Sequence, residues 1–338
     1  MARCRLDFAQ ADGFRKYVEP LVGQSVVYPH MLPTQASGRW STSDPPKVNF
    51  PDDKKADLLG LPHLRSVFIP HPGTWWLKWD HDAIEAKLAA AYSGDQEDLE
   101  AFRLGYDIHT ITACRMFKLP LPPNLRNPDA PECEEWRARV SWQGSKGDRR
   151  RHLAKTARYA LSYGSNENSI LNAAGIEQLG LTQAELLNFA RVYLETKPAL
   201  VAWKSRVWSR CAQERMARTF MGRRRMLYGE GLVMAREGLN HEIQGSVADI
   251  NNTNLVAIEA AYPEMRVITN AHDGNEVSFP VINRVNEVDA VVRTIVEREW
   301  DINDSKIKFY AEWGWVDDQG QSHRLPKSSL SVTPPGSD

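Results

Sequence analysis

Strand-forming and helix-forming patterns occupy separate parts of this chain. The aromatic run TWWLKWD at 74–80 and the alternating run KIKFYAEWGW at 306–315 are typical of strands. RVITNAHDGNEVSFPVI at 266–282 places two apolar segments around Asp-Gly-Asn, as a β-hairpin does. From about residue 149 the apolar residues recur at helical spacing for many turns. We therefore expect an α+β fold, in which a mainly helical lobe is inserted into a sheet-based lobe.

Local signals predict where several helices begin and end. We expect Gly94 to stop the helix that follows residue 80, and Asp107 to cap the next one. Thr182 and Glu185 are spaced as a capping box, and a helix is predicted at about 287–300. An apolar stripe expected to be buried on one long helix comprises Leu200, Trp203, Val207, Trp208 and Cys211.

The composition is that of an ordinary globular protein. Its 338 residues, 42% hydrophobic and 25% charged, give enough length for two lobes. No run of about 18 apolar residues could span a bilayer, and the start MARCRLDFAQADGFRK lacks the apolar region of a signal peptide. We therefore expect a cytoplasmic protein without a membrane partner. The cysteines have no C-x-x-C spacing and are expected to be free thiols.

The formal net charge of −1 provides no overall excess of positive charge for binding nucleic acid. The basic residues are nevertheless clustered, which favours a nucleic-acid surface only if other residues supply matching chemistry. Solvated helix faces explain such runs equally well. The clusters are Lys146, Arg149, Arg150, Arg151, Lys155 and Arg158, and Lys204, Arg206, Arg210, Arg215, Arg218, Arg223, Arg224 and Arg225.

Two carboxylates, Asp80 and Asp273, lie at the ends of predicted strands. If these strands are neighbours, the pair could hold two divalent ions, the usual device for in-line displacement at phosphorus. Hard oxygen ligands of this kind suit Mg²⁺. Taken singly, Asp80 could be a helix cap and Asp273 the aspartate of an ordinary turn, so both interpretations stay open.

Arg151, Lys155, Tyr159 and Tyr163 recur at every fourth residue, which places them on one broad face of a helix. Two cations followed by two aromatic rings could meet a triphosphate and then a base and sugar. Lys155 could also donate a proton to a leaving pyrophosphate. The alternative is a surface helix with a tyrosine seam against a core.

Six segments resemble, in the correct order, motifs of the family A (DNA polymerase I) DNA polymerases. TQASGRWSTSDPPKVNFP at 34–51 resembles TGRLSSSDPNLQNIP, and DHDAIEAK at 80–87 resembles motif A, DYSQIELR. SGDQEDLEAFRLGYDIHTITA at 93–113 is similar to the stretch that follows motif A.

The other three segments come later in the chain. RHLAKTARYALSYG at 151–164 is similar to motif B, RxxxKxxxFGxxYG, and LNHEIQGSVADI at 239–250 to NAPMQGTAADI. AHDGNEV at 271–277 resembles motif C, VHDELVF. The resemblance covers roughly residues 34–330. It implies a polymerase palm with inserted helical fingers, and attack of a primer 3′-OH on the α-phosphate of a dNTP with release of pyrophosphate.

The resemblance also implies roles for single residues. Asp80 and Asp273 are expected to bind two Mg²⁺ ions, with Mn²⁺ as an alternative, helped by the backbone carbonyl of His81. Glu85 falls at the steric gate that crowds a ribose 2′-OH. The positions that hold the triphosphate are matched by Arg151, Lys155 and His109. Tyr163 matches the residue at the closing base pair. The positions that contact primer and template are matched by Arg39, Arg236, Asn240, Gln244 and His272.

Each of these positions also has an ordinary interpretation. Arg39 could form a loop salt bridge, His109 could be a helix-start residue and Glu85 a solvated charge. Asn240 and Gln244 could be plain helix surface.

The sequence departs from the family pattern at three places. Motif C reads His-Asp-Gly, so Gly274 replaces a second carboxylate, and whether Glu276 or Asp82 compensates stays open. Tyr159 stands where many bacterial enzymes carry Phe, and its hydroxyl near the sugar 3′ position predicts good acceptance of dideoxynucleotides. The third departure is that only the residues before Arg39 are available for the helical thumb.

The expected domains are an N-terminal segment at 1–35, at most a thumb remnant, palm at 36–95 and 232–338, and fingers at 96–231. The expected partners are primer-template DNA and dNTPs, with a separate protein supplying the thumb, exonuclease or processivity. If the protein is phage-encoded, its location is the bacterial host cytoplasm.

Two other activities stay open. A single-subunit RNA polymerase shares the palm, although the carboxylate of Glu85 argues against it. A catalytically silent DNA-binding subunit would agree with Gly274 and a reduced thumb.

Overall fold

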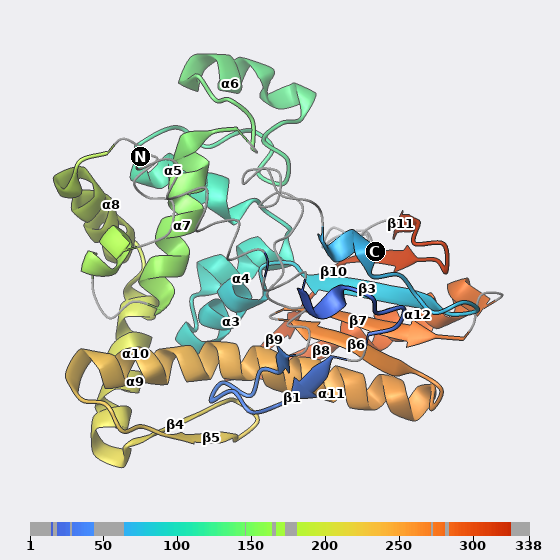
Figure 1. The fold of residues 1–338 in the computed structure, drawn as a ribbon. Coiled ribbons are helices and arrows are strands. Elements are labelled where there is room, and N and C mark those ends of the chain that lie inside the picture. The colour runs from blue at the N-terminus through green and yellow to red at the C-terminus, as the bar shows by residue number, and fades with distance from the viewer. Residues whose placement is uncertain are drawn as a thin grey trace, which may run out of the picture. The chain divides into compact units, whose positions relative to one another are not determined.

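The protein is described by a computed structural model that covers residues 15, 19–27, 29–43, 64–145, 147–163, 167–172, 181–271, 273–280 and 284–325. The chain forms two compact units, each described separately below (Figure 1). The sheet unit comprises Met1–Asp82, Val247–Glu297 and Tyr310–Lys327, and the helical unit comprises Ala83–Ser246, Arg298–Phe309 and Ser328–Asp338. The predicted α+β class is confirmed.

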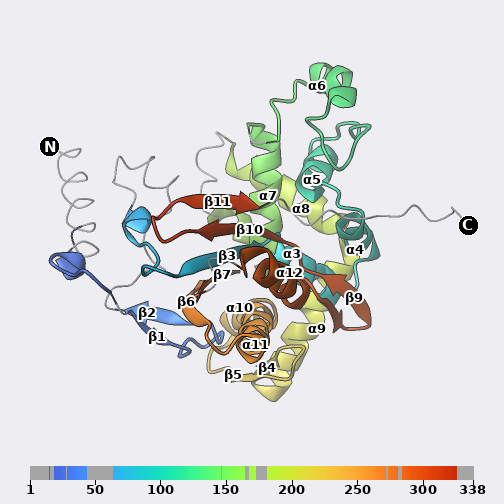
Figure 2. The same cartoon turned by 90° about the vertical axis from the view of Figure 1, so that its right-hand side faces the viewer.

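The sheet unit is built on five antiparallel strands in the order β11-β10-β3-β7-β6 (Figure 2). The strand β3, predicted from TWWLKWD, is central because β7 and β10 both pair with it. A two-stranded sheet, β1 with β2, belongs to the same unit. The bounds are β1 His30–Leu32, β2 Ser41–Ser43, β3 Trp75–His81, β6 Arg266–Ala271, β7 Gly274–Phe279, β10 Ala311–Val316 and β11 Ser322–Leu325, with 3₁₀ turns at Glu19–Leu21 and Leu64–Val67.

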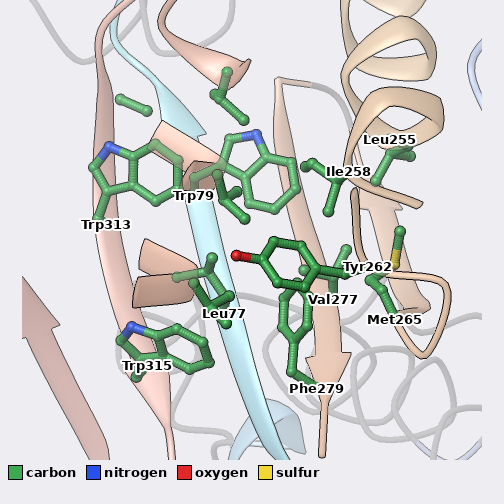
Figure 3. Close-up of a cluster of buried hydrophobic side chains, with 14 residues drawn as sticks. Leu77, Trp79, Leu255, Ile258, Tyr262, Met265, Val277, Phe279, Trp313 and Trp315 are labelled. Atoms are coloured by element: carbon green, nitrogen blue, oxygen red, sulfur yellow. The ribbon is translucent and has the colours of Figure 1, made fainter. Parts of the chain in front are cut away.

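One face of this sheet carries the core (Figure 3). Alternate residues of β3, Leu77 and Trp79, point into it, and the Trp79 ring lies 5.8 Å from that of Trp313 on β10. The helices α11, Ser246–Ala261, and α12, Val285–Val296, cover this face with buried aliphatic side chains. The intervening residues of β3 therefore point to the opposite face, and Asp80 is one of them.

The helical unit contains eight helices among its described residues, and two hairpins. The capping signals are confirmed: Gly94 ends α3 in a left-handed conformation, Asp107 caps α5, and Thr182 with Glu185 forms the capping box of α8. The helices are α3 Ile84–Ser93, α4 Gln96–Arg103, α5 Ile108–Met116, α6 Glu134–Val140, α7 Arg149–Tyr163, α8 Gln183–Glu195, α9 Pro198–Glu214 and α10 Gly231–Asn240.

The remaining described elements of this unit are short. A π turn, His241–Gly245, joins α10 to α11. The hairpins are β4 Met216–Arg218 with β5 Arg224–Met226, and β8 Glu299–Ile302 with β9 Ser305–Lys308; 3₁₀ turns lie at Pro131–Cys133 and Glu167–Asn172.

Three predictions of secondary structure are wrong in detail. The helix expected to reach residue 300 ends at Val296, because Glu297 turns to accept hydrogen bonds from the Ala311 amide and the Trp313 indole. The run at 306–315 is divided between β9 and β10 rather than one strand. Trp208 is 46% exposed, so it does not belong to the buried stripe of α9.

The predicted ranges for palm and fingers remain predictions. The helical unit begins at Ala83 and its long segment ends at Ser246, so it extends beyond 96–231 at both ends. About half of residues 1–35 lie outside the described part of the chain. Within the described residues, Cys114, Cys133 and Cys211 are free, and none of the helices is both long and apolar enough to cross a membrane.

Candidate active site

Asp80 and Asp273 meet at one end of the sheet. Asp80 lies opposite Gly274 in the pairing of β3 with β7, and Asp273 immediately precedes that glycine. The His81 amide donates a hydrogen bond to the Asp273 carbonyl at 3.2 Å. The two carboxyl groups are close enough that the charge of Asp273 raises the pKa of Asp80. The pairing of β3 with the hairpin therefore brings together two acids that are far apart in the sequence.

The electrostatic environment of Asp80 is unfavourable for its negative charge. Loss of solvent around the carboxyl, followed by repulsion from Asp273, Glu312 and Asp82, raises the pKa of Asp80 to about 7. Glu312 lies directly opposite Asp80 on β10, so it flanks Asp80 on the side away from Gly274. Glu312 is not among the predicted site residues, because its closeness to Asp80 depends on the pairing of β10 with β3.

The end of the sheet that carries Asp80 and Asp273, called the acidic end below, has chemistry that suits a divalent cation. Its carboxylate and carbonyl oxygens are the donors that Mg²⁺ prefers, and a cation would relieve the repulsion that raises the pKa of Asp80. No group of three or more His, Cys, Asp or Glu that could hold a metal is found among the described residues. Glu276 forms an ion pair with Lys78 at 2.9 Å, whereas Asp82 contributes to the repulsion at Asp80.

One face of α7 presents the predicted nucleotide residues. Lys155 is exposed, and Arg151 and Tyr159 are half-buried. Leu153, Ala157 and their neighbours on the opposite face are buried, which fixes the orientation of the helix within its unit. The side chain of Tyr163 lies outside the described residues.

Arg151 is already paired within the helical unit. Its Nε and Nη2 donate to the two carboxyl oxygens of Asp107, at 2.8 and 3.0 Å. Burial alone would raise the pKa of Asp107, but Arg151 holds that pKa below its ordinary value. Asp107, which caps α5, therefore holds the guanidinium of Arg151 on α7 in a fixed position.

His109 lies on α5 among three cations. Burial, and then repulsion from Arg158, Arg151 and Lys155, lowers the pKa of His109 to about 3. Its ring centroid is 6.3 Å from that of Tyr159. His109 is therefore neutral near pH 7, and it can serve a phosphate only as a hydrogen-bond donor.

Glu85 and Tyr159 line one small hollow of the helical unit, together with Ala86, Arg158 and Ser162. Glu85 comes from α3 and Tyr159 from α7, so two helices form this hollow. A carboxylate beside a phenol ring gives the hollow both bulk and charge. The steric gate at Glu85 stays a prediction.

A buried ionic network holds the back of α7. Arg158 donates to Asp98 on α4 at 2.8 Å, and Lys197, at the start of α9, lies 2.6 Å from Asp98 and 3.1 Å from Asp95. The side chains of Arg158 and Lys197 are only 5% and 3% exposed. Burial alone would raise the pKa of Asp98, but the two cations hold it below its ordinary value. The network was not predicted.

The residues predicted to contact primer and template lie in both units. Arg236, Asn240 and Gln244 belong to the helix that runs through α10 and the π turn; Arg236 is exposed and the other two are half-buried. Arg39 belongs to the sheet unit, where it is half-buried. His272 lies outside the described residues.

Comparisons with known proteins show what this chain is similar to. The family model for DNA polymerase family A matches residues 6–127 and 138–316. DNA polymerase I of Thermus thermophilus is 27% identical over 301 residues, 84% of this chain and 32% of that protein. DNA polymerase I of Pseudomonas aeruginosa is 26% identical over 281 residues, 80% of this chain and 27% of that protein. The chain thus spans about a third of the length of these curated relatives.

A solved structure shares the fold. The polymerase domain of Pol1 from M. smegmatis, in complex with a DNA primer-template and dNTP, aligns with a TM-score of 0.71 and 20% sequence identity. The alignment covers 90% of this chain and 52% of that one.

Proposed function

Since this chain belongs to DNA polymerase family A, we propose that it is a template-directed DNA polymerase that extends a primer 3′-OH with dNTPs and releases pyrophosphate. The observation that carries this proposal is the meeting of Asp80 and Asp273 at adjacent strand ends, with like charges that raise the pKa of Asp80 to about 7. A pair of carboxylates destabilised in this way favours binding of a cation over a purely structural role.

In the proposed reaction, Asp80, Asp273 and the His81 carbonyl hold two Mg²⁺ ions. When bound, such ions stabilise the attacking and leaving oxygens of an in-line displacement at phosphorus. The residues themselves keep the acidic end rigid, because β3 is paired on both sides. Mn²⁺ satisfies the same oxygen donors.

The helical unit supplies the nucleotide side. Arg151 and Lys155 attract the triphosphate, the neutral His109 donates a hydrogen bond to it, and Lys155 gives a proton to the leaving pyrophosphate. Glu85 excludes a ribose 2′-OH, and the Tyr159 hydroxyl favours dideoxynucleotides. Tyr163 contacts the closing base pair.

Both units contribute residues that contact DNA in the proposed function. Primer-template DNA meets Arg39, Arg236, Asn240, Gln244 and His272. The sheet unit corresponds to the palm and the helical unit to the fingers.

A single-nucleotide extension assay tests the proposal. The protein is mixed with a labelled primer-template and one dNTP at a time, with Mg²⁺ or with EDTA. We expect extension only by the complementary dNTP and only with Mg²⁺. Binding of the DNA without any extension would instead identify a silent DNA-binding subunit. Extension by ribonucleotides in preference to dNTPs would identify an RNA polymerase.

A further inference from the structure

The π turn His241–Gly245 changes which residues share a face of its helix. In an α-helix a step of four residues overshoots a full turn by about 40°, so Arg236, Asn240 and Gln244 would drift around the axis. A π turn rotates less per residue, because its i→i+5 hydrogen bond encloses an additional residue. The π turn therefore returns Gln244 toward the side of the helix that carries Arg236 and Asn240. Within the turn, Gln244 is the one residue that is not buried.

Glu242 is the buried charge of this turn. It is only 2% exposed, and a buried carboxylate is costly unless it is paired. The Trp203 indole donates to its Oε2 at 2.9 Å, and Arg210 forms an ion pair with it. Both partners are on α9, so Glu242 ties the turn to that helix.

Two other elements of the helical unit hold the same turn. From α3, the Tyr92 hydroxyl lies 2.7 Å from Ser246 Oγ, which itself donates to the Glu242 carbonyl. From the β4–β5 hairpin, Arg223 donates to the Gly245 carbonyl at 2.5 Å. The carbonyls that a π turn leaves poorly satisfied are thus bonded by side chains.

A carboxylate at this position is not explained by stability alone. A buried ion pair usually contributes no more stability than well-packed apolar side chains of similar volume. The family motif NAPMQGTAADI has proline where this chain has Glu242, so the anchor is a feature of this sequence.

We propose that Glu242, anchored to Arg210 and Trp203, is a positioning residue that fixes the π turn and so aligns Gln244 with Asn240 and Arg236 against primer-template DNA. The inference rests on the proposed function, because the DNA-binding role of this row belongs to that proposal.

The test is a double-mutant cycle on DNA affinity, measured by anisotropy with labelled primer-template and the full chain. Gln244→Ala is expected to raise Kd by about tenfold, the size of one lost hydrogen bond in a polar site. Glu242→Gln, which keeps an acceptor for Trp203 but loses the ion pair, is expected to raise Kd similarly. Because Glu242 acts through Gln244, the double variant should bind no more weakly than Gln244→Ala alone.

Glu237→Gln is the matched control, because Glu237 pairs with Arg225 at 3.0 Å on the same helix but outside the turn. Its Kd should stay at the wild-type value. If Glu242→Gln does not fold, the variant with both Arg210→Met and Glu242→Gln replaces it. It keeps an acceptor for the Trp203 indole and leaves no unpaired guanidinium, so it should keep the thermal stability but still raise Kd.

Each contrary outcome has a distinct meaning. Wild-type Kd in Glu242→Gln, or additive effects in the double variant, would overturn the inference while the DNA-binding role of Gln244 stands. Wild-type Kd in Arg236→Ala, Asn240→Ala and Gln244→Ala together would overturn the DNA-binding role of the row, and the inference with it.

Discussion

Asp80 in the sheet unit is exposed and Asp98 in the helical unit is buried, and the charges that surround the two aspartates differ in sign. Asp98 lies between Arg158 and Lys197, and its pKa is held below the ordinary value. Asp80 faces Asp273, Glu312 and Asp82, and its pKa is raised to about 7. The helical unit thus neutralises its buried charge internally, whereas the sheet unit leaves an excess of negative charge at one end of β3. Only the second arrangement calls for a cation from outside.

The largest expected effect is the loss of catalysis when the negative charge of Asp80 is removed. Asp80→Asn should lower the rate of primer extension by about 10³-fold or more, because metal stabilisation of the transition state is worth several kcal/mol. Its primer-template affinity and melting temperature should not fall, since the change removes repulsion. Glu276→Gln is the control, because Glu276 lies in the same hairpin but is paired with Lys78. Near-normal extension by Asp80→Asn would refute the metal assignment.

The buried cluster of Asp98, Arg158 and Lys197 should affect the stability of the protein. Asp98→Asn leaves Arg158 and Lys197 buried without their common counter-charge, and we expect a loss of about 3–5 kcal/mol in the free energy of unfolding. Urea denaturation measures this loss. Glu100→Gln is the control, because the Glu100–Arg103 pair is exposed and should contribute little. Equal stability of Asp98→Asn and the control would show that the network is not structural.

The two aspartates should respond oppositely to pH in the metal-free protein. A raised carboxyl pKa means that the native state binds more protons than the unfolded state, so Asp80 costs stability as pH rises from about 4 to about 7. The lowered pKa of Asp98 contributes stability above its unfolded pKa that is lost as pH falls through the folded value. Between pH 4 and 8, the melting temperature of Asp80→Asn should therefore rise relative to that of the wild type as the pH increases. Added Mg²⁺ should reduce this difference. A constant difference would contradict the charge repulsion.

The smallest expected effect concerns Glu85. Unlike Asp80 and Asp98, this carboxylate is expected to act by the volume of its side chain rather than by its charge. Glu85→Ala should increase ribonucleotide incorporation relative to deoxyribonucleotide incorporation by about tenfold or more, since it opens the hollow beside Tyr159. Glu85→Gln keeps the volume and should retain most of the discrimination. The ratio of kcat/KM values for a matched NTP and dNTP measures both variants. Loss of discrimination in Glu85→Gln would show that charge rather than bulk excludes the ribose.

Local sequence signals predicted the elements that carry the acidic end. The aromatic run before Asp80 and the two apolar segments around Asp-Gly-Asn are short-range patterns that predicted β3 and the β6–β7 hairpin. Gly274 and Asn275 nevertheless lie in β7 rather than in the turn. Glu312 was missed because its closeness to Asp80 depends on the pairing of β10 with β3, which no local pattern encodes.

Tertiary pairing also explains what the sequence could not show in the helical unit. Arg158 was read as one member of a basic run, but its charge is buried against Asp98. Arg151 was predicted from motif B, yet its partner Asp107 lies on another helix. The π turn could not be predicted because its apolar spacing is compatible with a regular helix, and its anchors come from α3, α9 and the β4–β5 hairpin.

The central position of β3 has a consequence for how the chain folds during synthesis. β3 emerges early, but its two neighbours, β7 and β10, are among the last elements made. Each helix of the helical unit forms from residues that are close in sequence, which is fast, whereas the sheet closes across long sequence separations. A nascent chain that ends before residue 311 leaves one edge of β3 unpaired, and an exposed aromatic strand edge invites association with other chains. Asp80 therefore leaves the ribosome early but is among the last residues to reach its native surroundings.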